Sequence, residues 1–176
     1  MLVKCSMCQH ENVSGVDRCE ECLHSLMQKD LPRPKRGDSI QRTLMTTPIY
    51  ELLTGKDLLV ADPGDTVQKA VDILRKERKN CILVYENKKL VGILSNSNLL
   101  HKVAGKIKDL TSVKIKDVMT VNPEFVLPED TIAVVVNKMA MGGFRHVPVL
   151  DKDGTPLSIL TIKDVIFYIT SKNRPS

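Results

Sequence analysis

The hydrophobic and polar positions of the C-terminal third of the chain predict one compact supersecondary unit. Asp130 and Thr131 come just before an apolar run, which is a helix-start signal, and Gly142 and Gly143 end that run. Two short segments rich in β-branched residues follow, separated by a turn of the DxDG kind, so a hairpin is expected. A last helix begins where the second strand ends. The whole unit lies between Pro128 and Val165.

The same pattern occurs earlier in the chain. The offset is 65 residues up to the hairpin and 66 after it, so the second turn is one residue longer. Self-similarity at a fixed period indicates that the chain is built from two copies of one supersecondary unit. The matching segments are PGDT at 63–66 with PEDT at 128–131, CILVY at 81–85 with HVPVL at 146–150, and LVGILSNSNLL at 90–100 with PLSILTIKDVI at 156–166.

The repeated unit resembles the CBS domain, and the pair resembles a Bateman module. The resemblance covers residues 47–170, about three-quarters of the chain, and implies an α+β fold of tandem β-α-β-β-α repeats. The motifs that carry it are DVMT at 117–120, PEDT at 128–131, RHVPV at 145–149 and TIKD at 161–164.

Four cysteines near the N-terminus have the spacing of a metal site. Cys5 and Cys8 form one CxxC pair, and Cys19 and Cys22 form a second, ten residues further on. Each pair can present two thiolates to one ion, and two such knuckles complete a tetrahedral site. Because so short a segment buries too little surface to fold unaided, the metal would supply the folding energy. The segment closely resembles a short zinc ribbon, although the spacing does not distinguish zinc from iron.

The cysteines also have alternative interpretations. Two disulfides are disfavoured in a cytoplasmic chain, and a redox site needs only one CxxC pair. His10 and His24 lie beside the knuckles and could act as ligands. With four suitably spaced cysteines present, we expect both histidines at the surface.

The remaining residues of the ribbon are expected to shape it. Asn12 and Gly15 fit the turn between the knuckles, and Leu23 and Leu26 would cover its base. The fifth cysteine, Cys81, opens an apolar strand, so we expect it to be buried and unreactive.

Composition and charge narrow the classes of partner. The 176 residues carry a net charge of +5, are 42% hydrophobic and only 3% aromatic, and contain no Trp. Since stacking of single-stranded nucleic acid needs aromatic side chains, a nucleic-acid partner is disfavoured. No stretch approaches the roughly 18 apolar residues of a membrane span. The start of the chain lacks a signal-peptide pattern, so we expect a cytoplasmic protein that does not enter a membrane.

The segment from Gln28 to Met45 is predicted to be a basic linker. Its PRPKR sequence cannot continue a helix, because each Pro restrains itself and the preceding residue. The basic charge could contact phosphates, but a solvated tether is the simpler interpretation. The predicted organisation is a zinc ribbon at 1–27, a linker at 28–46, and CBS repeats at 47–112 and 113–176.

No catalytic constellation is visible in the sequence, which lacks a phosphate loop, a nucleophile elbow and an HExxH motif. The resemblance agrees, because it implies a sensor that binds an adenine nucleotide (AMP, ADP or ATP) and performs no catalysis.

In the family register, four residues of the second repeat would hold the ribose and phosphates. Asp164 corresponds to the carboxylate that accepts hydrogen bonds from both ribose hydroxyls, and Thr161 can donate to a phosphate or ribose oxygen. Arg145 and His146 match the basic pair that contacts phosphate. Each of these residues also fits a structural role, such as helix capping by Asp164. The residues expected around the base are Met119, Thr120 and Val121 beside the adenine, with Val147 and Val149 lining the pocket.

The first repeat departs from this pattern. Asn98 takes the place of Asp164, and Asn80 and Cys81 replace the basic pair. An amide accepts through one oxygen only, so it should hold a ribose diol less well. One ligand per chain is therefore expected.

Two helices of the second repeat, Thr131–Met141 and Asp164–Thr170, are apolar on more than one side. A helix that is apolar all round is buried, so a second packing surface is expected. Helices at these places form the dimer surface in many CBS pairs, and a two-fold homodimer is the default for a self-complementary patch. Val135 and Met139 are the residues chosen as its contacts.

The sequence therefore predicts a regulatory protein whose CBS pair senses an adenine nucleotide and whose ribbon binds a protein partner or stabilises an assembly. The alternative is a nucleic-acid-associated protein that uses the ribbon and the basic linker, with the CBS pair as scaffold. The first 27 residues carry two basic and four acidic residues, which favours the first interpretation.

Overall fold

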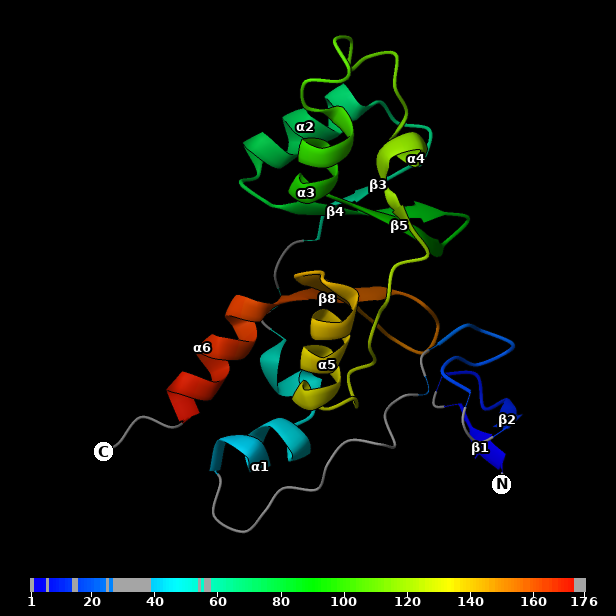
Figure 1. Cartoon of the computed structure of the whole chain (residues 1–176), viewed down its shortest axis with the longest axis vertical. Coiled ribbons are helices and arrows are strands. Elements are labelled where there is room, and N and C mark those ends of the chain that lie inside the picture. The colour runs from blue at the N-terminus through cyan, green and yellow to red at the C-terminus, as the bar shows by residue number, and fades with distance from the viewer. Residues whose placement is uncertain are drawn as a thin grey trace. The chain divides into compact units, whose positions relative to one another are not determined.

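The computed structural model describes residues 2–5, 7–13, 16–24, 26, 39–53, 55 and 58–172. The chain divides into two compact units (Figure 1). Unit 1 combines Met1–Gly55 with Glu124–Ser176, and unit 2 is Lys56–Pro123. Within the described ranges, no helix is long and apolar enough to cross a membrane.

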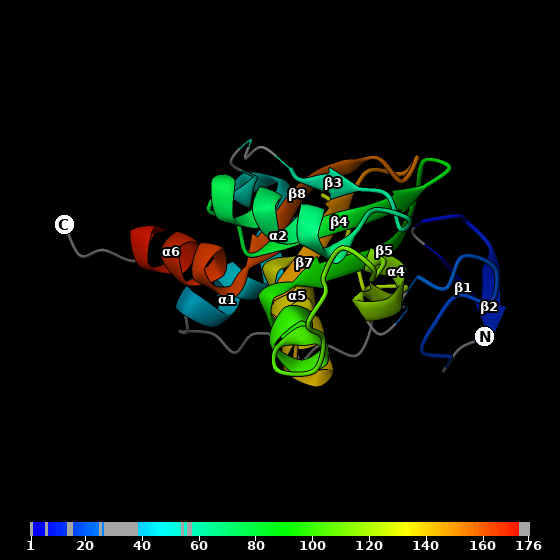
Figure 2. The ribbon, with the colours of Figure 1, turned by 90° about the horizontal axis from the view of Figure 1, so that it is seen from above.

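Unit 2 is a four-stranded sheet in which α2 and α3 cover one face (Figures 1 and 2). The strand β3 pairs in parallel with β4, and the other two pairings are antiparallel. In sheet order the strands are β3 (Val60–Ala61), β4 (Cys81–Glu86), β5 (Lys89–Ser95) and β6 (Thr120–Val121). The helices are α2 (Val67–Lys76), α3 (Asn96–Asn98), the π-helix η3 (Leu99–Val103) and α4 (Ile115–Val118).

The described residues of unit 1 form two antiparallel hairpins and four helices. The first hairpin belongs to the cysteine-rich segment, and α5 contacts α1, α6 and the second hairpin. The strands are β1 (Leu2–Lys4), β2 (Glu11–Val13), β7 (His146–Leu150) and β8 (Pro156–Thr161). The helices are α1 (Ser39–Thr46), the 3-10 helix η2 (Ile49–Leu52), α5 (Ile132–Gly142) and α6 (Ile162–Lys172).

The structure confirms the predicted order of helices and hairpin in the second repeat, although α6 (Ile162–Lys172) extends two residues beyond the predicted Asp164–Thr170 at each end. Helix α5 starts after Thr131 and ends at Gly143, whose φ of 65° is a left-handed conformation that glycine adopts without strain. In the β7–β8 turn, the Asp151 carboxylate accepts from the N–H groups of Asp153 at 3.0 Å and Thr155 at 2.7 Å. This side chain therefore closes the turn.

The predicted linker is only partly a linker. Its last residues form helix α1, which packs against α5. Leu44 is partly buried against the apolar core of unit 1, and this contact stabilises the helix. Residues 28–38 lie outside the described residues.

The leading segment of the first repeat packs on the second repeat, within unit 1. The N–H of Ile49 donates to the carbonyl of Asp130 at 2.8 Å, and the N–H of Ile132 donates to the carbonyl of Thr47 at 3.0 Å. Ile49 and Leu52 are buried in the same core as α5, β7 and β8. The helix η2 stands at the start of the first repeat in sequence but completes the core of the second repeat.

Unit 2 shows the reciprocal arrangement. Here α4, which leads into the second repeat, packs on the first. The N–H of Ile115 donates to the carbonyl of Asp65 at 2.9 Å, and the N–H of Val67 donates to the carbonyl of Val113 at 2.9 Å. Ile115 and Val118 are buried among the residues of α2, β4 and β5. Each repeat therefore lends its leading helix to the other.

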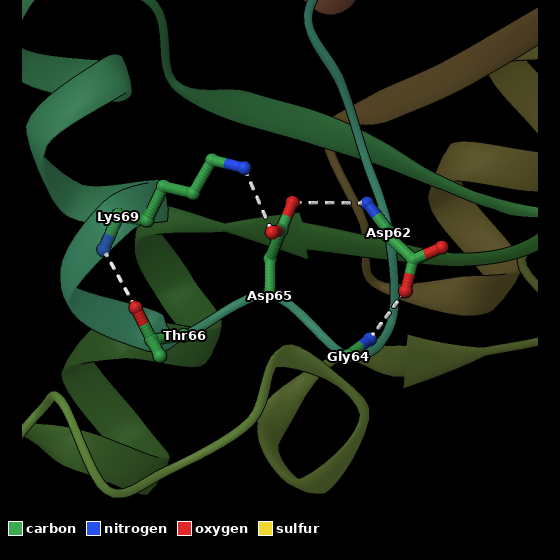
Figure 3. Close-up of polar contacts among 5 residues, drawn as sticks. All are labelled: Asp62, Gly64, Asp65, Thr66 and Lys69. Carbon is green, nitrogen blue, oxygen red and sulfur yellow. Dashed lines mark hydrogen bonds and ion pairs between the residues drawn. The ribbon is translucent and has the colours of Figure 1, made fainter.

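Side-chain hydrogen bonds hold the turn before α2, which carries the Asp65 carbonyl that accepts from Ile115 (Figure 3). The Asp65 carboxylate accepts from the N–H of Asp62 at 3.2 Å and pairs with Lys69 Nζ at 2.8 Å. Asp62 accepts from the N–H of Gly64 at 2.8 Å, and Thr66 caps α2 by accepting from the N–H of Lys69 at 3.2 Å. The hydrogen bond from Lys69 holds the pKa of Asp65 below its usual value. In unit 1 the equivalent Asp130 accepts from the N–H of Leu127 at 2.8 Å and is buried.

We predict that Asp130→Ala lowers the free energy of unfolding by about 1.5–3 kcal/mol, because a buried N–H loses a charged acceptor. Asp65→Ala is the matched change in an exposed turn and is expected to cost less than about 1 kcal/mol. Denaturant unfolding followed by circular dichroism measures both variants. Equal losses would contradict the importance of burial.

Candidate functional site

The four N-terminal cysteines converge on one point. Their Sγ atoms all lie within 4.8 Å of one another, with 3.6 Å between Cys5 and Cys22 and 3.5 Å between Cys8 and Cys19. Four thiolates bound tetrahedrally to zinc lie roughly 3.8 Å apart. All five cysteines of the chain are free thiols. The four side chains therefore fit a single tetrahedral metal ion and could hold one.

Backbone hydrogen bonds build both knuckles in the same way. The N–H of Cys5 donates to the carbonyl of His10 at 2.9 Å, and that of Cys19 donates to the carbonyl of His24 at 2.8 Å. The N–H of Met7 points at Cys5 Sγ, at 3.4 Å. Such N–H groups stabilise a thiolate, so each knuckle is arranged for a charged ligand.

The residue four places after the first cysteine of each knuckle is left-handed, with φ of 61° at Gln9 and 60° at Leu23. This conformation is costly for residues other than glycine. Leu23 is 57% exposed, so it does not cover the base of the ribbon as its sequence suggested. Leu26 is half-buried.

Asn12 links the two knuckles from strand β2, not from the turn where the sequence placed it. Its Nδ2 donates to the carbonyl of His10 at 3.0 Å, and its Oδ1 accepts from the N–H of Glu20 at 2.9 Å. Asn12 is buried, so both hydrogen bonds are shielded from water. Gly15, the other predicted turn residue, lies outside the described residues.

His24 is buried, which corrects the expectation that it lies at the surface. Its exposed fraction is 1%, and its ring lies 5.1 Å from that of Phe125, between centroids. Burial lowers the pKa of His24, and the nearby Lys138 lowers it further. The imidazole is therefore neutral at pH 7. His10 is half-buried.

The thiols of the cluster differ in acidity. Burial raises the pKa of Cys5 and Cys22. Burial also acts to raise the pKa of Cys19, but hydrogen bonds from the N–H groups of Cys22 and Glu21 outweigh it and lower the value to about 6. Cys19 is therefore a thiolate at neutral pH. Metal binding must displace protons from other thiols, so affinity should fall as pH falls.

In the second repeat, three predicted nucleotide-binding residues come together where α6 begins. The Asp164 carboxylate accepts from the N–H of Thr161 at 2.8 Å and from its hydroxyl at 2.7 Å. His146 lies opposite Thr161 in the β7–β8 register. The strand pairing and the helix start thus hold a carboxylate, a hydroxyl and an imidazole on neighbouring positions.

The other predicted residues of this repeat differ in exposure. Arg145 is exposed, whereas Val147 and Val149 are fully buried in the core of unit 1. Burial lowers the pKa of His146, and Arg145 lowers it further while Asp164 acts to raise it. The ring is therefore neutral at pH 7, and Arg145 is the charged member of the expected basic pair.

Met119, Thr120 and Val121 belong to unit 2. Met119 is buried and lies over Gly92, where a side chain would clash with it. The hydroxyl of Thr120 accepts from Nδ2 of Asn98 at 2.9 Å, and Val121 is exposed. The structure thus brings Thr120 to the first-repeat counterpart of Asp164.

The first repeat reproduces the same helix start with an amide in place of the carboxylate. Oδ1 of Asn98 accepts from the N–H of Ser95 at 2.9 Å and from its hydroxyl at 2.7 Å. Cys81 is buried as expected, and burial raises its pKa to about 12. Its thiol is therefore protonated and inert.

Sequence reasoning missed a polar cluster that includes Arg18, the residue before Cys19. Lys138 is only 8% exposed and donates to Glu124 at 2.6 Å, while Glu124 also pairs with Arg18 of the ribbon. The one available signal was that Lys138 is the single charged residue of the helix Ile132–Gly142. A charge on an otherwise apolar helix requires a partner.

The profile of the CBS domain family matches residues 42–105 and 115–171, more than half of the chain. Together with the repeated β-α-β-β-α geometry, this match shows that the chain belongs to the CBS domain family. The repeat and the family that the sequence predicted are confirmed.

Individual relatives agree with this assignment. The chain is 32% identical over 110 residues to the CBS domain-containing protein CBSCBSPB3 of Arabidopsis thaliana, a match that covers 62% of this chain and 20% of that protein. The chain therefore spans about a fifth of the length of this curated relative.

Solved structures show the same fold. The CBS domain pair of protein MJ0100, in complex with 5′-methylthioadenosine and S-adenosyl-L-methionine, has a TM-score of 0.64 and 24% identity, covering 73% of this chain and 99% of that chain. CBSX2 in complex with AMP has a TM-score of 0.60 and 24% identity, covering 72% and 98%.

Proposed function

We propose that this chain is a non-catalytic regulatory protein whose second repeat binds an adenine nucleotide. The observation that carries the proposal is the junction of Thr161, Asp164 and His146 at the start of α6 in a chain of the CBS family. A carboxylate at a helix start suits a ribose diol, because it accepts two hydrogen bonds.

The ligands of similar proteins support an adenosine-containing molecule. The MJ0100 structure is a complex with 5′-methylthioadenosine and S-adenosyl-L-methionine. The CBSX2 structure is a complex with AMP. In this chain the exposed Arg145 supplies a positive charge for a phosphate, which favours AMP, ADP or ATP over an uncharged nucleoside. The roles of the five residues expected around the base stay predictions. They are Met119, Thr120, Val121, Val147 and Val149.

We predict that Asp164→Ala weakens nucleotide binding about tenfold or more, the equivalent of roughly 1.5–3 kcal/mol for a charge-assisted hydrogen bond. Asn98→Ala removes the matching helix cap in the first repeat and should weaken binding little. Asp164→Asn keeps the helix cap, as Asn98 does in the first repeat, so a change in affinity reports the loss of the negative charge alone. Titration calorimetry with AMP, ADP and ATP measures all three variants.

A thermal-shift panel of these nucleotides, S-adenosylmethionine and oligonucleotides precedes the titrations, because any ligand of the native state raises its stability. Stabilisation by oligonucleotides alone would contradict the nucleotide proposal and favour the nucleic-acid alternative. Equal losses in Asp164→Ala and Asn98→Ala would contradict the difference between the repeats.

We propose that the four-cysteine cluster is a structural zinc site and that the ribbon serves a protein partner or the assembly. Four thiolates with no open position suit a closed tetrahedral site. We predict one Zn²⁺ per chain, bound by Cys5, Cys8, Cys19 and Cys22. Chelation should unfold the Cys5–Cys22 segment and leave the CBS pair folded. Elemental analysis and amide NMR spectra measure both outcomes, and an intact segment after chelation would count against the site.

We also propose a homodimer through α5 and α6, with contacts that differ from those first chosen. Val135 and Met139 are buried within the core of unit 1, so a charge there would unfold the unit instead of testing an interface. The large apolar residues that these helices expose are Met141, Ile166 and Phe167, at 73%, 54% and 75%. An exposed apolar patch of this kind favours association.

We predict that Ile166→Asp and Phe167→Asp each convert the dimer to a monomer at micromolar concentration, because a carboxylate is costly to bury in an apolar contact. Leu100→Asp is the matched control at the equivalent position of the first repeat, where the side chain is 65% exposed. It should leave the dimer intact. Light scattering measures the mass, and a wild-type value near the 19.7 kDa of one chain would refute the dimer.

A further inference from the structure

An ion-pair chain connects the ribbon to the second repeat. Oε1 of Glu124 pairs with Arg18 of the ribbon, and Oε2 accepts from Lys138 Nζ at 2.6 Å. The side chain of Lys138 is 7% exposed and that of Glu124 is 19% exposed. A buried ammonium is costly unless a carboxylate compensates it. Arg18 therefore holds, from the ribbon, the carboxylate that Lys138 requires.

A second contact is a ring contact. The rings of His24 and Phe125 lie 5.1 Å apart between centroids, at an interplanar angle of 38°. Among the described residues, neither ring nitrogen of the buried His24 has a hydrogen-bond partner. The imidazole thus fills space against Phe125 as an apolar group would, without hydrogen bonds of its own.

Both ribbon side chains in these contacts are fixed by the second knuckle. Arg18 directly precedes Cys19, and the carbonyl of His24 accepts from the N–H of Cys19 at 2.8 Å. The N–H of His24 also hydrogen-bonds to Cys22. A metal that fixes the two cysteines therefore fixes the two side chains that contact the second repeat.

The segment that the ribbon contacts, at Glu124 and Phe125, is itself held by the core of the second repeat. Phe125 adjoins Val126, whose N–H donates to the carbonyl of Pro148 at 3.0 Å and whose carbonyl accepts from the N–H of Leu150 at 3.0 Å. Val126 is buried in the core of unit 1. The ribbon thus contacts a segment that is continuous with the second-repeat core.

We propose that the ribbon is a docked part of the second repeat and not a freely tethered appendage. Metal binding at the cysteines keeps Glu124, Phe125 and Lys138 covered, and loss of the metal uncovers them. This inference goes beyond nucleotide binding. The docking of the ribbon does not rest on the proposed metal site, whereas the dependence of the docking on metal does. It also extends the expected effect of metal removal, since the CBS pair stays folded but the second-repeat segment that the ribbon covers becomes exposed.

Nitrogen-15 relaxation of the intact, metal-loaded chain tests the docking. The amides of β1, β2 and the second knuckle should show the same rotational correlation time as those of α5, since a docked ribbon tumbles with its unit. A ribbon that tumbles faster than α5 overturns the proposal.

Charge reversal at Arg18 tests the ion-pair chain. Arg18→Glu places two carboxylates together and should shorten the correlation time of the ribbon, with the metal content unchanged. Lys4→Glu is the matched control, because it makes the same charge change beside the first knuckle, in an exposed pair with Glu11. It should leave tumbling unchanged. Equal effects of the two variants, or no effect of Arg18→Glu, overturn the assignment.

Two substitutions at His24 test the ring contact. His24→Phe keeps a ring and removes the unpaired nitrogens, so the ribbon should stay docked and retain its metal. His24→Ala removes the ring and should loosen the ribbon. Loss of metal in His24→Phe would instead identify the imidazole as a ligand and overturn its packing role.

Hydrogen exchange of the chelated chain tests the dependence on metal. The amides of Val126 and Leu150 should exchange about tenfold or more faster without metal, because their segment loses its cover. The amide of Val67 in unit 2 should not change. Unchanged exchange at Val126 overturns the metal dependence, and a free ribbon in a chain with full metal content overturns the docking alone, leaving the zinc proposal intact.

Discussion

The structure depends on reciprocal backbone pairing between each repeat and the leading segment of the other. Ile49 donates to Asp130 in unit 1, and Ile115 donates to Asp65 in unit 2. Both pairs lie where the following helix begins, so an N–H and a carbonyl that a solitary repeat would leave to water are satisfied. The apolar side chains of the same segments then close the two cores. The starts of α5 and α2 are therefore held by this exchange.

The apolar character of α5 has the same origin. The helix is contacted by α1, α6 and β7, and the burial of Ile132, Val135 and Met139 lies within one chain. A helix that is apolar on several sides needs several packing partners. Besides α6 and β7, the chain provides η2, which shares its core, and α1, which comes just before η2. The large apolar side chains that remain exposed are few, namely Met141 near the end of α5 and Ile166 and Phe167 in the middle of α6. The proposed dimer contact is therefore narrower than the helix composition suggests.

Much of the fold was predictable because its signals are local. The repeat, the PxDT helix starts and the cysteine spacing each follow from short stretches, so the hairpins, α5 and the cysteine cluster were confirmed. The exchange of leading helices joins residues such as Thr47 and Ile132, and periodicity within either segment carries no information about it. The burial of His24 likewise depends on Phe125, about a hundred residues away in the sequence. Helix α1 lies inside a predicted linker, because the prolines on which that prediction rested come before Ser39 and the helix packs against α5.

The exchange bears on the history of the chain as well as on its stability. A polypeptide that contained a single repeat would carry a leading helix that packs on a different copy, and a core that lacks a helix. Two such polypeptides could complete each other by swapping these segments, in the manner of a domain-swapped dimer. Gene duplication would then join two copies that were already interdependent. After fusion the helix starts of the two copies could diverge, as the amide of Asn98 and the carboxylate of Asp164 do, while each leading helix continued to support the fold of the other copy.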